Sequence, residues 1–143
     1  MTITIGVLRE VTPGETRVAL VPEVAGKFRS AGARVVVERG AGVQAQFPDS
    51  LWKDVEFAST GAEVLAAADV LVKVQPPTAE EVSALKPGAV TLSFVYGHQR
   101  PELVRAMRDG RITAFAMELV PRISRAQSMD ALSSQASTAG YQA

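Results

Sequence analysis

The chain has 143 residues, enough for one domain whose core buries about 70% of the surface of the unfolded chain. It carries 15 basic and 15 acidic residues and no cysteine, which excludes a broad basic surface for nucleic acid, a disulfide framework and cysteine-based zinc or thiol chemistry. The N-terminal residues lack the features of a signal peptide, and no apolar run approaches the roughly 18 residues of a membrane span. The composition therefore predicts a soluble cytoplasmic domain with no direct membrane insertion.

The first third of the chain predicts a strand–helix–strand unit. Residues 3–8 are a short β-branched run, which is typical of a buried strand. Pro22 begins a helix, at the position where its missing N–H costs nothing, and Gly32 ends it. Residues 34–38 are again β-branched and form the second strand. A βαβ unit implies parallel pairing with a right-handed crossover.

The segment after this second strand has the letters of a dinucleotide-binding fingerprint. Gly40-x-Gly42-x-x-Ala45 fits the pattern G-x-G-x-x-G/A, which requires a helix that begins directly at the glycines. Phe47-Pro48 interrupts such a helix within a few residues. We therefore interpret the glycines as a plain turn.

Helices and strands alternate through the rest of the chain. Trp52 and Phe57 are predicted to lie in the core. In order, the segments predict a helix at 49–59, a helix at 63–68, a strand at 70–74, a helix at 79–85, a strand at 90–95, a helix at 102–109, a strand at 112–117 and a helix at about 128–143. The fold class predicted is α/β, a doubly wound (Rossmann or flavodoxin-like) parallel sheet of about five strands with flanking helices, in a single domain. Ligands of such sheets bind beyond the carboxyl ends of the strands.

A polar stretch follows the last predicted strand. Arg122, Gln127, Asp130 and Ser133 combine a fork of donors, an amide, a carboxylate and a hydroxyl, which suits a flat ligand that bears an amide. The alternative is a helix N-terminus, because Ser124-x-x-Gln127 fits a capping box.

The run from Pro121 to Ser134, with Gly140-Tyr141 after it, resembles the NAD(H)-binding component of the proton-translocating nicotinamide nucleotide transhydrogenases. A more distant resemblance, to alanine dehydrogenases, covers the same length, from Gly6 to the last residue. The transhydrogenase resemblance implies that Arg122, Gln127, Asp130 and Ser133 surround the nicotinamide of bound NAD(H). It implies no catalytic acid or base and no metal on this chain, and Tyr141 is expected to have a packing role.

Two further residues are candidates for a substrate pocket. Lys73 is a charged residue within an apolar strand, where it is costly unless paired, so it belongs either to a site, the favoured interpretation, or to an exposed strand end. The resemblance to alanine dehydrogenases implies that Arg17 binds a substrate carboxylate and that Lys73 contacts the substrate. In that family the catalytic histidine aligns with Tyr96, two residues before His98. We therefore predict that His98 lies in a surface loop, which argues against an amino-acid dehydrogenase.

The resemblance also implies parts that lie outside this sequence. A second domain with a true glycine-rich fingerprint is expected to bind the adenosine and pyrophosphate of NAD, so the chain is predicted to be the N-terminal part of a larger two-domain subunit, with residues 128–143 leading to that domain. By itself the chain is expected to bind NAD poorly and to be inactive. Partner subunits are expected to bind NADP(H) and to translocate protons in the inner membrane, to which a homodimer of the larger subunit is peripheral on the cytoplasmic side. Two alternatives remain: an alanine-dehydrogenase-like oxidoreductase domain and a non-catalytic dimerisation or docking module.

Overall fold

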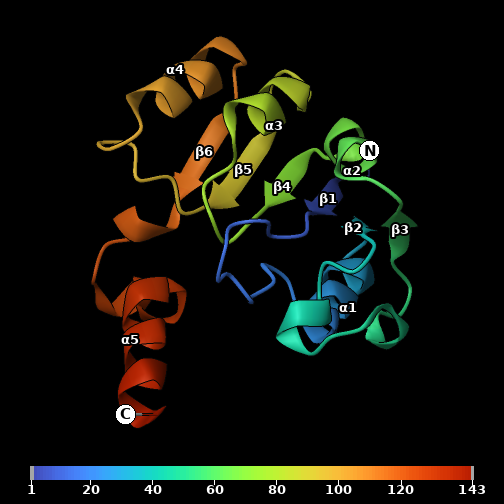
Figure 1. The fold of residues 1–143 in the computed structure, drawn as a ribbon, viewed down its shortest axis with the longest axis horizontal. Helices are drawn as coiled ribbons and strands as arrows, with labels where there is room; N and C mark the ends of the chain where they lie inside the picture. Colours follow the sequence, from blue (N-terminus) through green and yellow to red (C-terminus); the bar gives the residue numbers. More distant parts are fainter. Residues whose placement is uncertain (1, 143) are drawn as a thin grey trace.

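The computed structural model describes residues 2–142, which form an α/β domain around one parallel sheet (Figure 1). The sheet has six strands in the order β3-β2-β1-β4-β5-β6, and every neighbouring pair is parallel. This order is that of a doubly wound Rossmann-type sheet, so the predicted fold class is confirmed, with one strand more than expected. The strands are β1 (Thr4–Val7), β2 (Arg34–Glu38), β3 (Glu56–Ala58), β4 (Val70–Val72), β5 (Val90–Ser93) and β6 (Thr113–Ala116).

Local sequence signals set the helix boundaries. Proline occupies the first turn of both α1, as predicted, and α4, where its missing N–H leaves no intrahelical bond unmade. Thr60 caps α2 by accepting a hydrogen bond from the amide of Glu63, and Thr78 forms a capping box with Glu81 at the start of α3. The helices are α1 (Pro22–Ser30), α2 (Gly61–Ala67), α3 (Ala79–Ala84), α4 (Pro101–Asp109) and α5 (Ala131–Gln142).

Two apolar clusters cover the two faces of the sheet. One packs β1, β2 and β4 against α1 and the segment around Trp52, with Val7, Val37 and Val72 at its centre. The other joins Leu71 and neighbouring strand residues to the buried sides of α2, α3 and α4. Helix α5 extends away from the sheet (Figure 1), and residues 132–141 are exposed.

The prediction of a helix at residues 49–59 was wrong. The chain forms a 3₁₀ turn at Asp49–Leu51 and then the edge strand β3, which pairs with β2. Asp54 has a left-handed backbone (φ 57°), which ends any helix there, and the buried Trp52 donates from its indole nitrogen to the Phe47 carbonyl at 3.2 Å. Glu56 also accepts two hydrogen bonds from Arg34 of β2, at 2.6 and 2.7 Å. Pairing with a neighbouring strand therefore outweighs the helical spacing of the apolar residues in this segment.

The expectations for single residues had mixed outcomes. Trp52 is buried as predicted, and Phe57 is half-buried against the apolar cluster that contains Val7, Val37 and Val72. Gly40 and Gly42 lie in a turn, so the interpretation of the glycines as a turn is confirmed, and an added Cβ at Gly42 would clash with the Phe47 carbonyl oxygen. Tyr141 is 91% exposed, because α5 extends away from the body of the domain before the chain reaches this residue. The expectation that Tyr141 packs against the rest of residues 2–142 was therefore wrong.

Within residues 2–142, none of the helices combines the length and the apolar character that crossing a membrane would need.

Close packing of α2 on β1 gives a prediction for stability. A Cβ at Gly6 would lie 2.8 Å from the Cβ of Ala68 and 2.9 Å from Val64 Cγ1. Gly6→Ala is therefore expected to lower the free energy of unfolding by about 1–3 kcal/mol through overpacking, measured by urea denaturation. Gly26→Ala in α1 is the control, because a Cβ there meets nothing within 4 Å. A loss at Gly6 no greater than at Gly26 would contradict the close packing.

Candidate functional site

The sheet order creates a crevice where β1 and β4 lie side by side. Connections leave these strands in opposite directions, which is where doubly wound sheets bind ligands. Glu10, just after β1, spans this point: its carboxylate accepts from the amides of Val74 at 2.6 Å and Gln75 at 3.3 Å. Burial raises the pKa of Glu10 above its ordinary value, although these two backbone bonds oppose the shift. The crevice is therefore braced across its two central strands by a carboxylate.

Arg17 and Lys73, predicted from different parts of the sequence, line one pocket of about 360 Å³ in this crevice. Val18, Ala19, Val74, Phe94, Met117, Ala131 and Gln135 complete its wall. Both cations already have carboxylate partners. Arg17 donates to Glu15 from Nε at 2.8 Å and from Nη2 at 2.7 Å, a bidentate pair.

The ammonium of Lys73 is buried, with a side-chain exposure of 3%. It donates to both carboxylate oxygens of Glu81, at 2.9 and 2.8 Å, and Glu81 at the same time closes the capping box of α3. The prediction that a lysine in this strand must be paired is thus correct. The pattern Thr78-x-x-Glu81 marks the capping box in the sequence, but it does not show that Glu81 also pairs with Lys73.

Arg17, in the loop between β1 and α1, also makes a hydrogen bond to α5. Its Nη1 donates to Gln135 Oε1 at 3.2 Å, and Gln75 donates to Glu15 at 2.7 Å. The bonds to Arg17, with a smaller one from Gln75, lower the pKa of Glu15 to about 2. Glu10, Glu15 and Glu81 were not predicted as site residues. Glu10 acts through amides more than 60 positions along the chain and Glu81 through Lys73, directly after β4, whereas Glu15 acts mainly through Arg17, two residues away.

The low pKa of Glu15 predicts an acid-dependent loss of stability. The folded-state pKa lies below the ordinary value of 4.5, so this carboxylate stabilises the fold above that pH and the contribution is lost as pH falls from about 4.5 to about 2. Glu15→Gln is expected to flatten that part of the pH profile of the unfolding free energy, measured by urea denaturation at successive pH values. An unchanged profile would show that Glu15 does not carry the effect.

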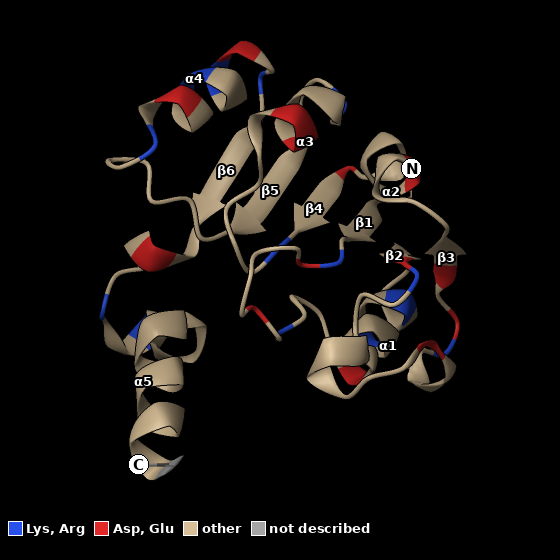
Figure 2. Cartoon of the chain, in the orientation of Figure 1, with Lys and Arg blue, Asp and Glu red and all other residues tan. Residues whose placement is uncertain are grey.

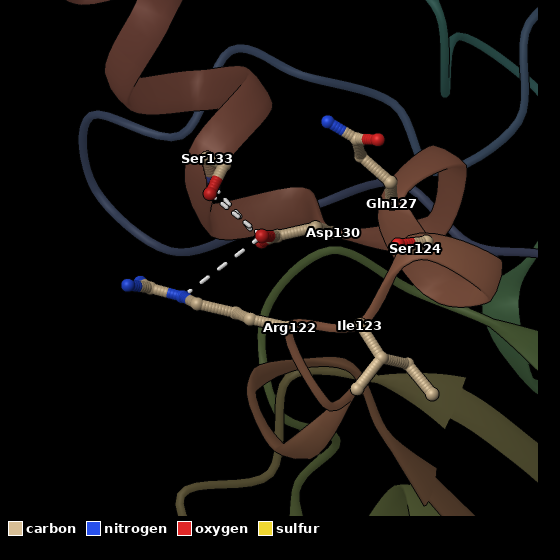
Figure 3. Close-up of a pocket in the computed structure, with 6 residues that line it drawn as sticks. All are labelled: Arg122, Ile123, Ser124, Gln127, Asp130 and Ser133. Carbon is tan, nitrogen blue, oxygen red and sulfur yellow. Dashed lines mark hydrogen bonds and ion pairs between the residues drawn. The ribbon is translucent and has the colours of Figure 1, made fainter.

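The four residues predicted to surround a nicotinamide line a second pocket, also of about 360 Å³ (Figure 3). Arg122, Gln127, Asp130 and Ser133 share it with Ile123 and Ser124. All six come from the turn of 3₁₀ helix at Ser124–Met129, its flanking residues and the first turn of α5. The structure therefore brings together the whole predicted set.

Asp130 sits at the centre of this pocket and caps α5. Its Oδ1 accepts from the amide of Ser133 at 3.0 Å, and its Oδ2 accepts from the Ser133 hydroxyl at 2.6 Å. These bonds lower the pKa of Asp130, with a smaller contribution from Arg122, whose Nε lies 3.9 Å away. The alternative capping box at Ser124 is not formed, since the 3₁₀ helix begins without a side-chain cap. The predicted helix consequently starts at Ala131 rather than near residue 128.

Arg122 and Gln127 are the groups of this pocket with donors to spare. The Arg122 side chain is 73% exposed, and in Figure 3 its guanidinium and the Gln127 amide lie on either side of Asp130. Within residues 2–142, Gln127 makes no side-chain hydrogen bond. An amide and a guanidinium with free donors, flanking a fixed carboxylate, can hold a ligand that both donates and accepts.

His98 lies in the loop after β5, as the sequence predicts. His98 is exposed, and its ring nitrogen lies 3.0 Å from Gln99 Nε2. Tyr96 has a left-handed backbone (φ 50°) and stacks on Phe94 with ring centroids 5.6 Å apart. Glu118, which was not predicted from the sequence either, holds this turn by accepting from the amides of Val95 at 3.1 Å and Tyr96 at 2.6 Å.

Residues 6–139 match the family described as alanine dehydrogenase/PNT, N-terminal domain. The chain is 48% identical, over 97% of its length, to an NAD(P) transhydrogenase subunit alpha protein of Rhodospirillum rubrum, of which it covers 38%. It superposes on a transhydrogenase structure from Sinorhizobium meliloti with a TM-score of 0.92 at 43% identity, covering 98% of this chain and 42% of that one. Similarity to the alanine dehydrogenase of Bacillus subtilis is lower, 35% over 81% of the chain and 31% of that protein. The chain belongs to the alanine dehydrogenase/PNT N-terminal domain family, with the transhydrogenase members more similar than the alanine dehydrogenase.

Proposed function

We propose that this domain forms one wall of the NAD(H) site of an NAD(P) transhydrogenase alpha subunit, and that the pocket at Arg122, Gln127, Asp130 and Ser133 holds the nicotinamide carboxamide. The observation that carries the proposal is the convergence of these four side chains on one pocket. A carboxamide has one donor and one acceptor group, which the Gln127 amide and the Arg122 guanidinium can match. The residues present therefore fit the ligand.

Each side chain has a distinct part in this proposal. Gln127 donates to the carboxamide oxygen and accepts from its NH₂ group, and Arg122 adds a further donor. Asp130 and Ser133 fix the start of α5 through their two hydrogen bonds, which sets the position of the pocket wall. Bound NAD(H) supplies the hydride chemistry, so the protein contributes orientation rather than an acid or a base.

The remaining parts of the enzyme are proposals that follow from the family. The chain spans 38% of the Rhodospirillum rubrum relative and 42% of the Sinorhizobium meliloti chain, which supports a larger subunit with a second NAD-binding domain. That domain would bind the adenosine and pyrophosphate of NAD(H). NADP(H) would bind a partner subunit, membrane subunits would translocate protons, and the alpha subunit would act as a homodimer on the cytoplasmic side of the inner membrane.

An alanine-dehydrogenase-like activity is the second candidate, and it is favoured by one observation. Arg17 and Lys73 line the same pocket at the switch point of the sheet, as a carboxylate-binding site would require. However, both cations are paired with Glu15 and Glu81, so a substrate carboxylate would have to compete with these partners.

One set of assays on the full-length subunit distinguishes three candidate functions: the transhydrogenase, the alanine-dehydrogenase-like enzyme and a non-catalytic docking module. The proposal expects saturable NADH binding, seen as a change in NADH fluorescence, and hydride transfer to an NADP analogue when the NADP-binding partner is added. Oxidation of L-alanine by NAD would instead support the dehydrogenase. Absence of NADH binding would leave the docking module.

A further inference from the structure

Helix α5 is joined to the loop between β1 and α1 by a hydrogen bond from Arg17. Nη1 of Arg17 donates to Oε1 of Gln135 at 3.2 Å. Among residues 2–141, this is the one hydrogen bond that joins α5 to the chain before Asp130. Figure 2 shows α5 without charged residues, and its residues 132–141 are exposed, so neither an ion pair nor deep packing holds it. The bond to Gln135 is therefore the polar contact that fixes the direction of α5.

The guanidinium of Arg17 is itself held from the side of the sheet. Glu15 accepts from its Nε and Nη2, and this fork fixes the plane of the guanidinium, so that Nη1 points to Gln135. Glu15 also accepts from the side chain of Gln75, which follows β4, at 2.7 Å. The amide of Gln75 in turn donates to Glu10, the brace across the crevice. A continuous run of hydrogen bonds therefore leads from the end of β4 to α5.

The start of α5 is a wall that the two pockets share. Ala131 and Gln135 line the pocket of Arg17, whereas Asp130 and Ser133 line the proposed nicotinamide pocket. The spacings i, i+4 and i, i+3 put these two pairs on different sides of the same helix turns. Gln135 lies only about 3 Å along the helix axis from Ser133, at a rise of about 1.5 Å per residue. A movement of Gln135 is therefore carried to Ser133 by the rigid backbone of the helix.

We propose that Arg17 is a positioning residue for the nicotinamide pocket: through Gln135 it sets the direction of α5, and with it the place of Ser133 in the pocket wall. This inference rests on the proposed function. Nε, Nη1 and Nη2 of Arg17 are each engaged, by Glu15 and Gln135, so Arg17 holds the protein together rather than a ligand. The competing role is direct binding of a ligand carboxylate by Arg17.

The first test replaces Gln135, in the full-length subunit, with two side chains of similar length. Gln135→Met removes the acceptor for Arg17, so hydride transfer to an NADP analogue is expected to slow about three- to tenfold, the value of one hydrogen bond. NADH binding is expected to change less than about twofold, because the cofactor contacts themselves remain. Gln135→Glu keeps the acceptor oxygen and adds a charge opposite Arg17, so it is expected to transfer at least as fast as the unaltered subunit. Gln44→Met is the control, since Gln44 is exposed and outside both pockets.

The second test separates positioning from ligand binding by Arg17. Arg17→Lys keeps a positive charge beside Glu15, but its single nitrogen replaces the fork that serves Glu15 and Gln135 together. If Arg17 acts through Gln135, Arg17→Lys slows transfer by the same factor as Gln135→Met, and the double variant is no slower than either. Effects that multiply in the double variant would show that Arg17 acts without Gln135, and would overturn the proposal.

The remaining outcomes of the first test are equally decisive. Transfer at the unaltered rate in Gln135→Met, or an equal loss in Gln135→Glu, would overturn the positioning role. Gln127→Asn in the same assay separates this result from failure of the proposed function. If Gln127→Asn slows transfer and Gln135→Met does not, only the role of Arg17 is rejected, whereas unaltered rates in both reject the nicotinamide pocket as well.

Discussion

Gln127→Asn in the full-length subunit is expected to slow hydride transfer to an NADP analogue about 100-fold, while NADH binding weakens less than tenfold. The shorter side chain keeps the amide but withdraws it by about one C–C bond from the proposed carboxamide contact. A displacement of about 1 Å in a reacting pair can cost about 100-fold in rate, whereas most of the binding energy comes from other parts of the cofactor. Stopped-flow measurement of hydride transfer and NADH fluorescence give the two quantities separately.

A matched control is available on the same domain. Gln44 is exposed in the 3₁₀ turn after β2, outside both pockets, so Gln44→Asn is expected to change neither quantity. Asp130→Asn is expected to follow Gln127→Asn in direction, since it weakens the cap that fixes Ser133 and the start of α5. Transfer at the unaltered rate in Gln127→Asn would reject its role in holding the carboxamide.

Glu81→Gln is expected to lower the free energy of unfolding by about 3–5 kcal/mol, the largest effect on stability that the structure predicts. The substitution keeps the shape of the side chain but leaves the buried ammonium of Lys73 without its counter-charge. Removing one partner of a buried ion pair has this cost because the remaining charge stays desolvated. Urea denaturation of the 143-residue chain measures the change.

The double variant and an exposed pair test the cause. Adding Lys73→Met to Glu81→Gln removes the stranded charge, so most of the loss should be recovered. Glu23→Gln breaks the exposed pair with Lys27, where the side chains are 78% and 69% exposed, and is expected to cost about 0–1 kcal/mol. A loss that persists in full when Lys73 is replaced would mean that Glu81 acts through the capping box alone.

Features that depend on neighbouring residues could be predicted from the sequence. The βαβ unit, the alternation of strands and helices, and the proline starts of α1 and α4 all follow from local patterns, and the structure contains them. The pocket at Arg122 to Ser133 is also local, because one turn and one helix start bring its residues together. Residues 122–133 are close in space because they are close in the chain.

Features that depend on distant residues could not be predicted. The segment at 49–59 has helical spacing, but a place beside β2 and the bonds from Arg34 to Glu56 make its second half a strand. The bond from Arg17 to Gln135 joins residues 118 positions apart, and no sequence pattern marks it. The need of Lys73 for a partner was predicted, yet only the fold identifies Glu81 as that partner.

A double-mutant cycle between Gln127 and the carboxamide tests the central claim most directly. The full-length subunit and its Gln127→Ala variant would be titrated with NADH and with an NADH analogue that has a methyl ketone in place of the carboxamide. Because the analogue lacks the NH₂ donor, the unaltered subunit is expected to bind NADH about tenfold more tightly than the analogue, the value of one hydrogen bond. In Gln127→Ala that preference is expected to disappear. A tenfold preference that survives unchanged in the variant would contradict the claim that Gln127 holds the nicotinamide carboxamide.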